Sequence, residues 1–260
     1  MFGRHTHLLN DEGLRALTTS FPFLKELDLN SAEKVTNWSP LLSLSSLKTL
    51  DVSYSSIGDE GFEAVALLSN LTTLKAHSVK FVTDAGLARF GSLTSLNTLD
   101  LGDVNVNEGL ESLAGLPNLK ALTLGDSATD SGLSFLTSLP ALETFKVSGD
   151  GVTDEGLVHL GSLANLTELD LSFSGITGAG LSLLAFLPLL RVLDISDCEV
   201  GDEGVQHLLR FPSLAGLKTG DISGERGKRI SGAGRERLKA GLPGLVFGKL
   251  PLDCVDDGDY

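Results

Sequence analysis

Leucine recurs along this chain at a nearly constant spacing. Nine leucines, which we call the leading leucines, follow one another at intervals of 23 to 25 residues. They are Leu24, Leu47, Leu71, Leu96, Leu119, Leu142, Leu166, Leu190 and Leu214. A final, irregular unit begins near Leu245. Such a register over most of a chain indicates stacked copies of one structural unit.

The unit that begins at Leu142 shows how each copy is organised. Phe145 and Val147, at positions +3 and +5 counted from the leading leucine, alternate with polar residues as in a strand with one buried face. The segment Thr153–Gly156 then opens a short helix, with Thr153 as its N-cap. The apolar stripe of this helix consists of Leu157, Leu160 and Leu163.

A short signal that contains acidic residues and a glycine precedes the helix in most units. We expect its acids to interact with the positive end of the helix dipole. Glycine is unfavourable inside a helix, so its recurrence at one position predicts that neighbouring units approach closely there. The acids of these signals are Asp11, Glu12, Asp59, Glu60, Asp84, Glu108, Asp130, Asp154, Glu155, Asp202 and Glu203.

No single unit has enough apolar surface to bury its own leucines, so the units must stack. Stacking places the strands side by side in one sheet and the helices behind them. The sequence therefore predicts an α/β solenoid, a right-handed superhelix with a parallel concave sheet and short convex helices.

The units share the pattern L-x-x-L-x-L-x-x-(S/C)-x-x-(V/I)-T-D-x-G-L-x-x-L-x-x-L. This pattern resembles the cysteine-containing class of leucine-rich repeats, which occurs in F-box substrate receptors and in several bacterial proteins. Cys198 occupies the cysteine position of that class, and serine occupies it in other units, at Ser55, Ser127 and Ser174. We expect no F-box, because too few residues precede Leu8 to form one. The resemblance implies a fold and says almost nothing about function.

We expect one leucine-rich-repeat domain, followed by an acidic tail. The domain spans residues 1–248, with a partial first repeat at 8–23, full repeats from 24 and a degenerate closing repeat at 214–248; the tail spans 249–260. The partial repeat has no strand, so the sheet would begin after Leu24 with a free edge. We expect another chain, or sequence upstream of Met1, to cover this end.

Partner binding is expected on the concave face, because repeat solenoids use that face. Side chains at positions +2 and +4 point out of the sheet, and position +4 is mainly aspartate interrupted by lysine. The candidate binding residues are Asp28, Asp51, Tyr54, Lys75, Asp100, Lys146, Asp170, Phe173, Asp194 and Lys218. Tyr54 and Phe173 would be aromatic anchors, although Phe173 fits equally well between turns.

The aspartates of this face have two interpretations. Adjacent strands lie ~4.8 Å apart, so Asp28 would lie beside Asp51, and Asp170 beside Asp194. Like charges at this distance destabilise the fold unless a cation or a basic partner meets them. Alternatively, the carboxylates are simply solvated and discourage association of sheet edges.

The net charge of −14 and the pI near 4.7 argue against nucleic acid and anionic membranes as partners. They favour a protein partner with a basic surface. An insertion holds the exceptional cluster of cations, Arg226, Lys228 and Arg229, and is a second candidate contact. The two cysteines, Cys198 and Cys254, are too few for a disulfide framework, which favours the cytoplasm or another reducing intracellular compartment. No apolar run is long enough to span a membrane.

Catalytic signatures are missing from the sequence: it contains no phosphate-binding loop, no zinc-protease helix motif and no nucleophile elbow. His5 and His7 form an H-x-H pair, but no further ligand supports a metal site. His159 and His207 fall on the helices, where we expect them to be solvated. We therefore expect no enzyme activity, no cofactor and no metal.

The leading hypothesis is a protein–protein interaction module that acts as a non-catalytic subunit or adaptor in a larger assembly. Two alternatives remain open. One is the substrate-recognition part of a ubiquitin-ligase-type receptor, as the resemblance implies. The other is an acidic solenoid that regulates or inhibits an enzyme.

Overall fold

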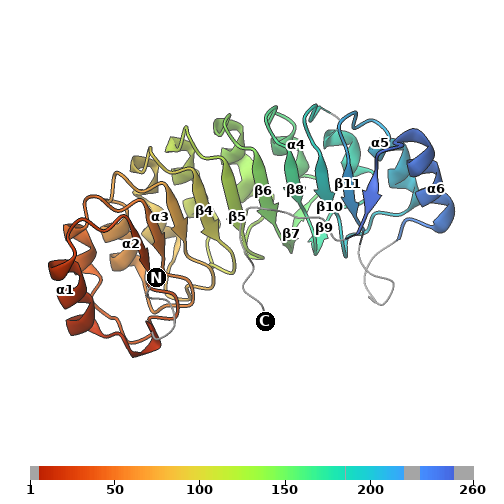
Figure 1. Ribbon diagram of the computed structural model, residues 1–260. Helices are drawn as coiled ribbons and strands as arrows, with labels where there is room; N and C mark the ends of the chain where they lie inside the picture. The colour runs from red at the N-terminus through yellow and green to blue at the C-terminus, as the bar shows by residue number, and fades with distance from the viewer. Residues whose placement is uncertain (1–5, 185, 220–228, 249–260) are drawn as a thin grey trace. The chain divides into compact units, whose positions relative to one another are not determined.

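The fold is described here for residues 6–184, 186–219 and 229–248 of the computed structural model. Contacts within the chain divide it into two units, residues 1–127 and 128–260. We therefore describe each unit by itself (Figure 1). The expectation of one continuous repeat domain over residues 1–248 stays a prediction.

Unit 1 consists of short parallel strands that alternate with helical segments. Its strands are β1 (Glu26–Asp28), β2 (Thr49–Asp51), β3 (Thr73–Lys75), β4 (Thr98–Leu101) and β5 (Ala121–Leu124), and they pair in chain order. Its helical segments are η1 (Thr6–Leu8), α1 (Asp11–Ser20), η2 (Ser39–Ser43), α2 (Asp59–Val65), α3 (Asp84–Leu87), η3 (Phe90–Ser92) and η4 (Glu108–Gly115). Every strand begins two residues after a leading leucine, which confirms the register.

Unit 2 repeats this arrangement. The parallel strands of its main sheet are β6 (Thr144–Val147), β8 (Glu168–Asp170), β10 (Val192–Asp194), β11 (Gly216–Lys218) and β12 (Val246–Phe247), which pair in this order. Its helical segments are η5 (Ser131–Ser138), α4 (Leu157–Leu160), η6 (Gly180–Leu184), η7 (Asp202–Gly204), α5 (Val205–Leu208) and α6 (Gly232–Gly241). A second small sheet, which the sequence did not predict, pairs β7 (Gly149–Thr153) with β9 (Ser174–Gly175).

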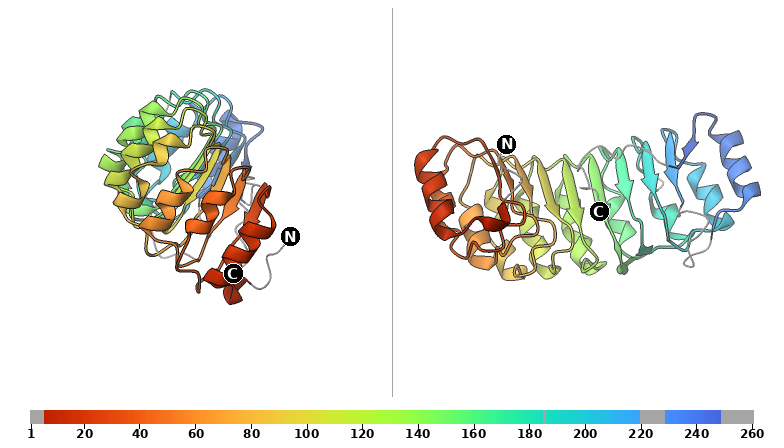
Figure 2. Two further views of the ribbon diagram at one scale, coloured as in Figure 1. Left: turned by 90° about the vertical axis from the view of Figure 1, so that its left-hand side faces the viewer. Right: turned by 60° about the horizontal axis from the view of Figure 1, so that its bottom comes forward.

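In both units the helices lie on one side of the sheet, as Figure 2 shows. Most helical segments are 3-10 turns or α-helices of four to seven residues, so the expectation of short helices is correct. The core between the two layers is a stack of leucines. Leu99 in unit 1 is 1% exposed and Leu169 in unit 2 is fully buried. Each such leucine contributes roughly 1.5–3 kcal/mol of burial free energy.

The aspartate of the helix-start signal forms hydrogen bonds to the next repeat, which we did not predict. The carboxylate of Asp59 accepts hydrogen bonds from the backbone N–H (2.8 Å) and the hydroxyl (2.7 Å) of Thr83 in the next repeat. The same two bonds join Asp130 to Thr153 and Asp154 to Thr177. We call this arrangement the inter-repeat clasp. The aspartates thus connect neighbouring repeats, a role that comes in addition to the expected one at the helix dipole, since Asp59 lies in the first turn of α2.

The glycine of the same signal is explained by the clasp. A Cβ atom on Gly86 would lie 2.5 Å from the Oδ1 atom of Asp59, and Gly156 and Gly180 meet the clasp aspartates of their own neighbours in the same way. The predicted close approach is confirmed. The hydroxyl of Thr153 accepts a hydrogen bond from the N–H of Glu155 at 3.2 Å, as the predicted N-cap would, but α4 itself begins only at Leu157.

In several repeats position +8 holds serine or cysteine, and the side chains of Ser174 and Cys198 are buried and point at a backbone carbonyl. The hydroxyl of Ser174 (2.6 Å) and the thiol of Cys198 (3.0 Å) both donate to the carbonyl oxygen of Leu171. Burial raises the pKa of the Cys198 thiol. Serine and cysteine are exchangeable in this pattern because each supplies a small donor to the same type of acceptor.

Candidate functional site

The aspartates at position +4 end their strands with a hydrogen bond. The Oδ1 atom of Asp51 accepts from the backbone N–H of Ser53 at 2.9 Å, and that of Asp170 accepts from the N–H of Ser172 at 3.0 Å. The aspartates Asp28, Asp100 and Asp194 form the equivalent bond. An aspartate that bonds to the backbone two residues further on stabilises a turn. Sequence reasoning missed this role, although the recurrence of aspartate at the last strand position was its signal.

In unit 1 the strand register brings the candidate residues into one row. Asp28 lies opposite Asp51, Asp51 opposite Lys75, and Lys75 opposite Asp100. Their exposure differs: Asp28 is exposed, Asp51 and Lys75 are half-buried, and Asp100 is only 4% exposed. Asp100 therefore offers little surface to a partner, in contrast with the open position expected for it.

In unit 2 the corresponding row is Lys146, Asp170, Asp194 and Lys218, again in register. The predicted adjacency of Asp170 and Asp194 is correct. However, Asp194 is 5% exposed and forms an ion pair with Lys218 at 3.1 Å. Part of the negative charge is thus compensated within the chain, by an ion pair that neither of the two predicted interpretations, an external cation or partner or simple solvation, had included.

The two aspartates without such an ion pair have perturbed acidities. Among the described residues, neither Asp51 nor Asp170 lies within ion-pair distance of a basic side chain. Burial raises the pKa of Asp51 above its ordinary value, and the charge of Asp28 adds to this, although the hydrogen bonds from Ser53 and the charge of Lys75 act to lower it. Burial and the neighbouring charge of Asp194 raise the pKa of Asp170. Positive charge placed near either carboxylate would therefore be stabilising.

The two candidate aromatic residues lie just past these aspartates, at position +7. Tyr54 has φ +58° and Phe173 has φ +59°, so both adopt the left-handed backbone conformation that bulky residues rarely adopt. The N–H of Tyr54 donates to the carbonyl of His77, and that of Phe173 donates to the carbonyl of Ser196. Tyr54 is 48% exposed and Phe173 is 57% exposed. The anchor positions are confirmed as exposed, and Phe173 is not tucked between turns.

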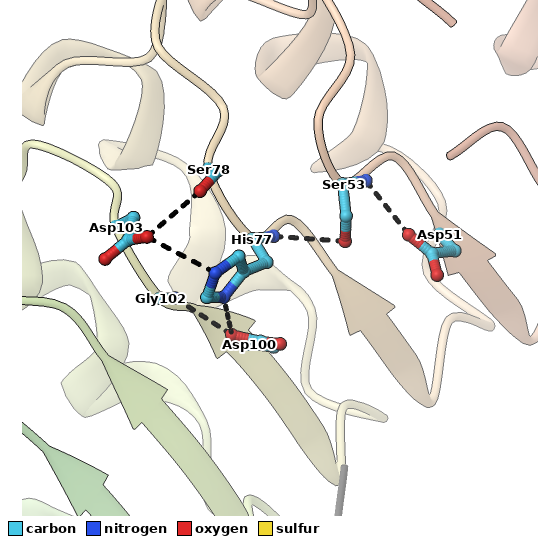
Figure 3. Close-up of polar contacts among 7 residues, drawn as sticks. All are labelled: Asp51, Ser53, His77, Ser78, Asp100, Gly102 and Asp103. Carbon is cyan, nitrogen blue, oxygen red and sulfur yellow. Dashed lines mark hydrogen bonds and ion pairs between the residues drawn. The ribbon is translucent and has the colours of Figure 1, made fainter. Parts of the chain in front are cut away.

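His77, which no sequence motif singles out, lies at the centre of a polar cluster in unit 1 (Figure 3). Its Nε2 atom lies 3.4 Å from Oδ2 of Asp103, and its Nδ1 atom lies 3.8 Å from Oδ1 of Asp100. Its ring faces that of Tyr54 with a centroid separation of 5.4 Å. Gly102 leaves the space for this ring, because a Cβ atom there would lie 2.7 Å from its Cε1 atom. His77 thus connects the ring of Tyr54 to the carboxylates of Asp100 and Asp103.

The sequence contained little warning of this cluster. His77 and Asp103 lie at positions +6 and +7, beyond the strand, where the alternation of buried and exposed residues no longer predicts direction. Asp103 shares the left-handed backbone of Tyr54 and accepts a hydrogen bond from the hydroxyl of Ser78 at 3.1 Å. Hence residues that follow the strand in one repeat interact with residues of the next repeat: His77 and Ser78 contact Asp103.

The remaining candidates are less informative. Arg226, Lys228 and His5 lie outside the described residues, and Arg229 is exposed. The expectation of a solvated His207 is wrong, because its Nδ1 atom is buried without a hydrogen bond. His159 is half-buried. Within the described ranges, no group of three or more His, Cys, Asp or Glu side chains is arranged to hold a metal ion.

Comparison with known proteins identifies the repeat. The family model described as "Leucine Rich repeat" matches residues 43–66, 162–185 and 187–209. The fold is a leucine-rich-repeat solenoid. An internalin (inlF) from Listeria monocytogenes is 18% identical and superposes with a TM-score of 0.58, covering 88% of this chain and 75% of that one. At this identity, the likeness shows the fold alone.

A second leucine-rich-repeat neighbour is more distant in structure. An internalin C2 (inlC2) from the same species is 24% identical, with a TM-score of 0.46, and the match covers 74% of this chain and 69% of that one. No curated protein matches the chain. Among the described residues, no helix is long and apolar enough to cross a membrane.

Proposed function

We propose that this leucine-rich-repeat chain is a protein-binding module whose sheet face receives a partner with a basic surface. The observation that carries the proposal is the row of charged and aromatic side chains on this face, which the helices of the same unit leave uncovered because they pack on the opposite side. The net charge of −14 favours a basic partner.

The exposed groups of the face suit protein recognition. Interfaces rely on aromatic anchors surrounded by polar side chains, and Tyr54 and Phe173 supply such anchors beside the carboxylates of Asp51 and Asp170. The half-buried lysines of the row, such as Lys75, alternate with these acids and would set the orientation of a partner. The face therefore offers both affinity and specificity.

Photo-crosslinking from the native source would test the proposal. A photoreactive phenylalanine analogue replaces Thr73, on the sheet face of β3, or Glu63, on the outer side of α2. We expect crosslinks to a protein from position 73 and none from position 63. The captured protein should have a basic surface. Adducts from position 63 alone would contradict the proposal. The identity of the captured protein would also separate an adaptor or subunit role from a ligase-type receptor and from an acidic regulator.

The end of unit 1 is a second proposed contact. β1 is the first strand in the pairing order of its sheet, and Phe23, just before it, is 82% exposed. An open strand edge beside an exposed aromatic ring favours coverage by another chain or by upstream sequence. Hydrogen exchange would test this: the amides of Glu26–Asp28 should exchange faster than those of Thr144–Val147 and become protected when the edge is covered.

A further inference from the structure

The exposed aromatic residues at position +7, Tyr54 and Phe173, belong to segments of nearly identical sequence. The first segment is Asp51-Val52-Ser53-Tyr54 and the second is Asp170-Leu171-Ser172-Phe173. We call them the D-x-S-aromatic segments. Each occupies positions +4 to +7 of its repeat, one in unit 1 and the other in unit 2. The arrangement thus occurs twice, independently of how the units are placed.

The aromatic side chain is not required by the fold at this position. Equivalent residues in other repeats are small or polar and adopt the same left-handed conformation: Ser31, Ser78, Asp103 and Asp197. A large side chain is disfavoured in this conformation. About half of each ring stays in water, so burial within the chain does not compensate fully. A large, exposed ring on a left-handed backbone is unfavourable for the chain alone, which indicates that the ring contacts a binding partner.

Each ring stands three residues after a carboxylate that has an aspartate on one adjacent strand and a lysine on the other: Lys75 lies beside Asp51 and Lys146 beside Asp170. Asp51 lies beside Asp28 in the sheet, and Asp170 lies beside Asp194. In both segments a serine N–H fixes one carboxylate oxygen and thereby the direction of the carboxyl group. Burial is the main cause that raises the pKa values of Asp51 and Asp170, and the neighbouring aspartates add to it, whereas Lys75 and Lys146 act in the opposite direction.

We infer that each D-x-S-aromatic segment receives an arginine side chain of the protein partner, with the guanidinium against the aromatic ring and its charge met by the carboxylate. This rests on the proposed function and names the partner group that the sheet face recognises. Arginine fits better than lysine, because its flat guanidinium stacks on a ring while its N–H groups remain available to a carboxylate. In unit 1, the ring of His77 lies 5.4 Å from that of Tyr54, centroid to centroid.

Fluorine NMR offers a direct test in unit 1, because the chain has only two tyrosines, Tyr54 and Tyr260. The full chain is labelled with fluorotyrosine, and Tyr54→Phe assigns the signals. The probe is a short peptide with three arginines; the control peptide has citrulline, the neutral isostere, in their place. We expect a saturable shift of the Tyr54 signal with the arginine peptide and at least a tenfold weaker response with citrulline.

Variants identify the groups responsible. Asp51→Asn keeps the turn acceptor and removes the charge, so it should weaken arginine-peptide binding about three- to tenfold. Tyr54→Ser, which restores the residue type of neighbouring repeats, should weaken it similarly without loss of stability. Glu63→Gln, on the helical side, removes the same unit of charge and should change affinity less than twofold. Phe173→Ser and Asp170→Asn test the second segment in the same peptide assay.

Three outcomes would overturn the inference. Equal responses to the arginine and citrulline peptides would mean that the Tyr54 ring binds peptides without selecting for positive charge. Equal losses from Asp51→Asn and Glu63→Gln would mean diffuse attraction to an acidic protein. If crosslinks from position 73 identify a partner whose binding Tyr54→Ser and Asp51→Asn leave unchanged, the sheet face binds but the arginine subsite is wrong. Crosslinks from position 63 alone would instead reject the proposed function.

Discussion

Replacing the clasp aspartate Asp154 by alanine tests the coupling between repeats. The carboxylate of Asp154 accepts two bonds from Thr177, from the N–H at 2.8 Å and from the hydroxyl at 2.6 Å. A hydrogen bond to a charged group contributes about 1.5–3 kcal/mol to stability. Both residues are half-buried, so in the variant water can hydrogen-bond to the N–H and hydroxyl of Thr177 and offset part of the lost stability. We therefore expect Asp154→Ala to lower the free energy of unfolding by about 2 kcal/mol.

The adjacent acid is the matched control. Glu155 belongs to the same helix-start signal but its side chain is exposed. Glu155→Ala should therefore change stability by less than about 0.5 kcal/mol. A helix-dipole role would give both substitutions similar small effects of roughly 0.3–1 kcal/mol. Urea unfolding monitored by circular dichroism measures the difference between the two variants.

Hydrogen exchange adds a local measurement. In Asp154→Ala, the amide of Thr177 should lose roughly 30-fold in protection, which corresponds to about 2 kcal/mol. In unit 1, Asp59→Ala and Glu60→Ala repeat the comparison, because Asp59 makes the same clasp. If the aspartate and glutamate variants unfold at the same urea concentration in both units, the clasp contributes nothing and our reasoning is wrong.

Three further predictions concern the stacked core and the clasp. Leu169→Ala should lower the free energy of unfolding by about 2–5 kcal/mol in urea titrations, because its side chain is fully buried in the leucine stack; an unchanged midpoint would contradict the register. Gly180→Ala should destabilise by roughly 1–3 kcal/mol, because its Cβ would collide with the clasp aspartate. Gly232→Ala is its control: nothing lies within 4 Å, and stability should stay equal or rise by up to ~1 kcal/mol. Hydrogen bonds from Ser231 lower the pKa of Asp202 below its ordinary value of 3.8, so its contribution to stability is present above that value and is lost as the pH falls through the lowered pKa. Urea midpoints at pH 5 and pH 3 should therefore fall less in Asp202→Asn than in the unchanged chain, and an equal fall would contradict this.

The fold was predictable because its cause repeats in the sequence. Leucine at the leading position and apolar residues at +3 and +5 specify where strands begin, and every strand of the main sheets follows that register from β1 to β11. The glycine after the clasp aspartate was likewise readable as a close approach. The second role of the aspartate in the same signal was not predicted. The sequence position of Asp154 indicates a helix start, and only the stacked structure shows that its carboxylate accepts hydrogen bonds from Thr177 in the next repeat.

The candidate site was predictable only as far as the strands extend. Along each strand, side chains point alternately to the two sides of the sheet up to position +4. Asp51 and Asp170 were therefore correctly placed on the sheet face, away from the helices. Their burial was not, because it depends on neighbours one repeat away, as the ion pair of Asp194 with Lys218 illustrates. His77 escaped notice for the same reason: its partners Asp100 and Asp103 come from the following repeat.

Recognition in such a repeat must lie in the positions that stacking leaves free. Positions +3, +5 and +8 are occupied by the core, and the helix-start signal is occupied by the clasp. Only +2, +4 and the turn residues +6 and +7 can vary without breaking the stack. At +7 the left-handed backbone favours small or polar residues, so an aromatic side chain there departs from what the repeat needs. Departures of this kind, at Tyr54 and Phe173, indicate a partner more strongly than any residue that conforms to the pattern.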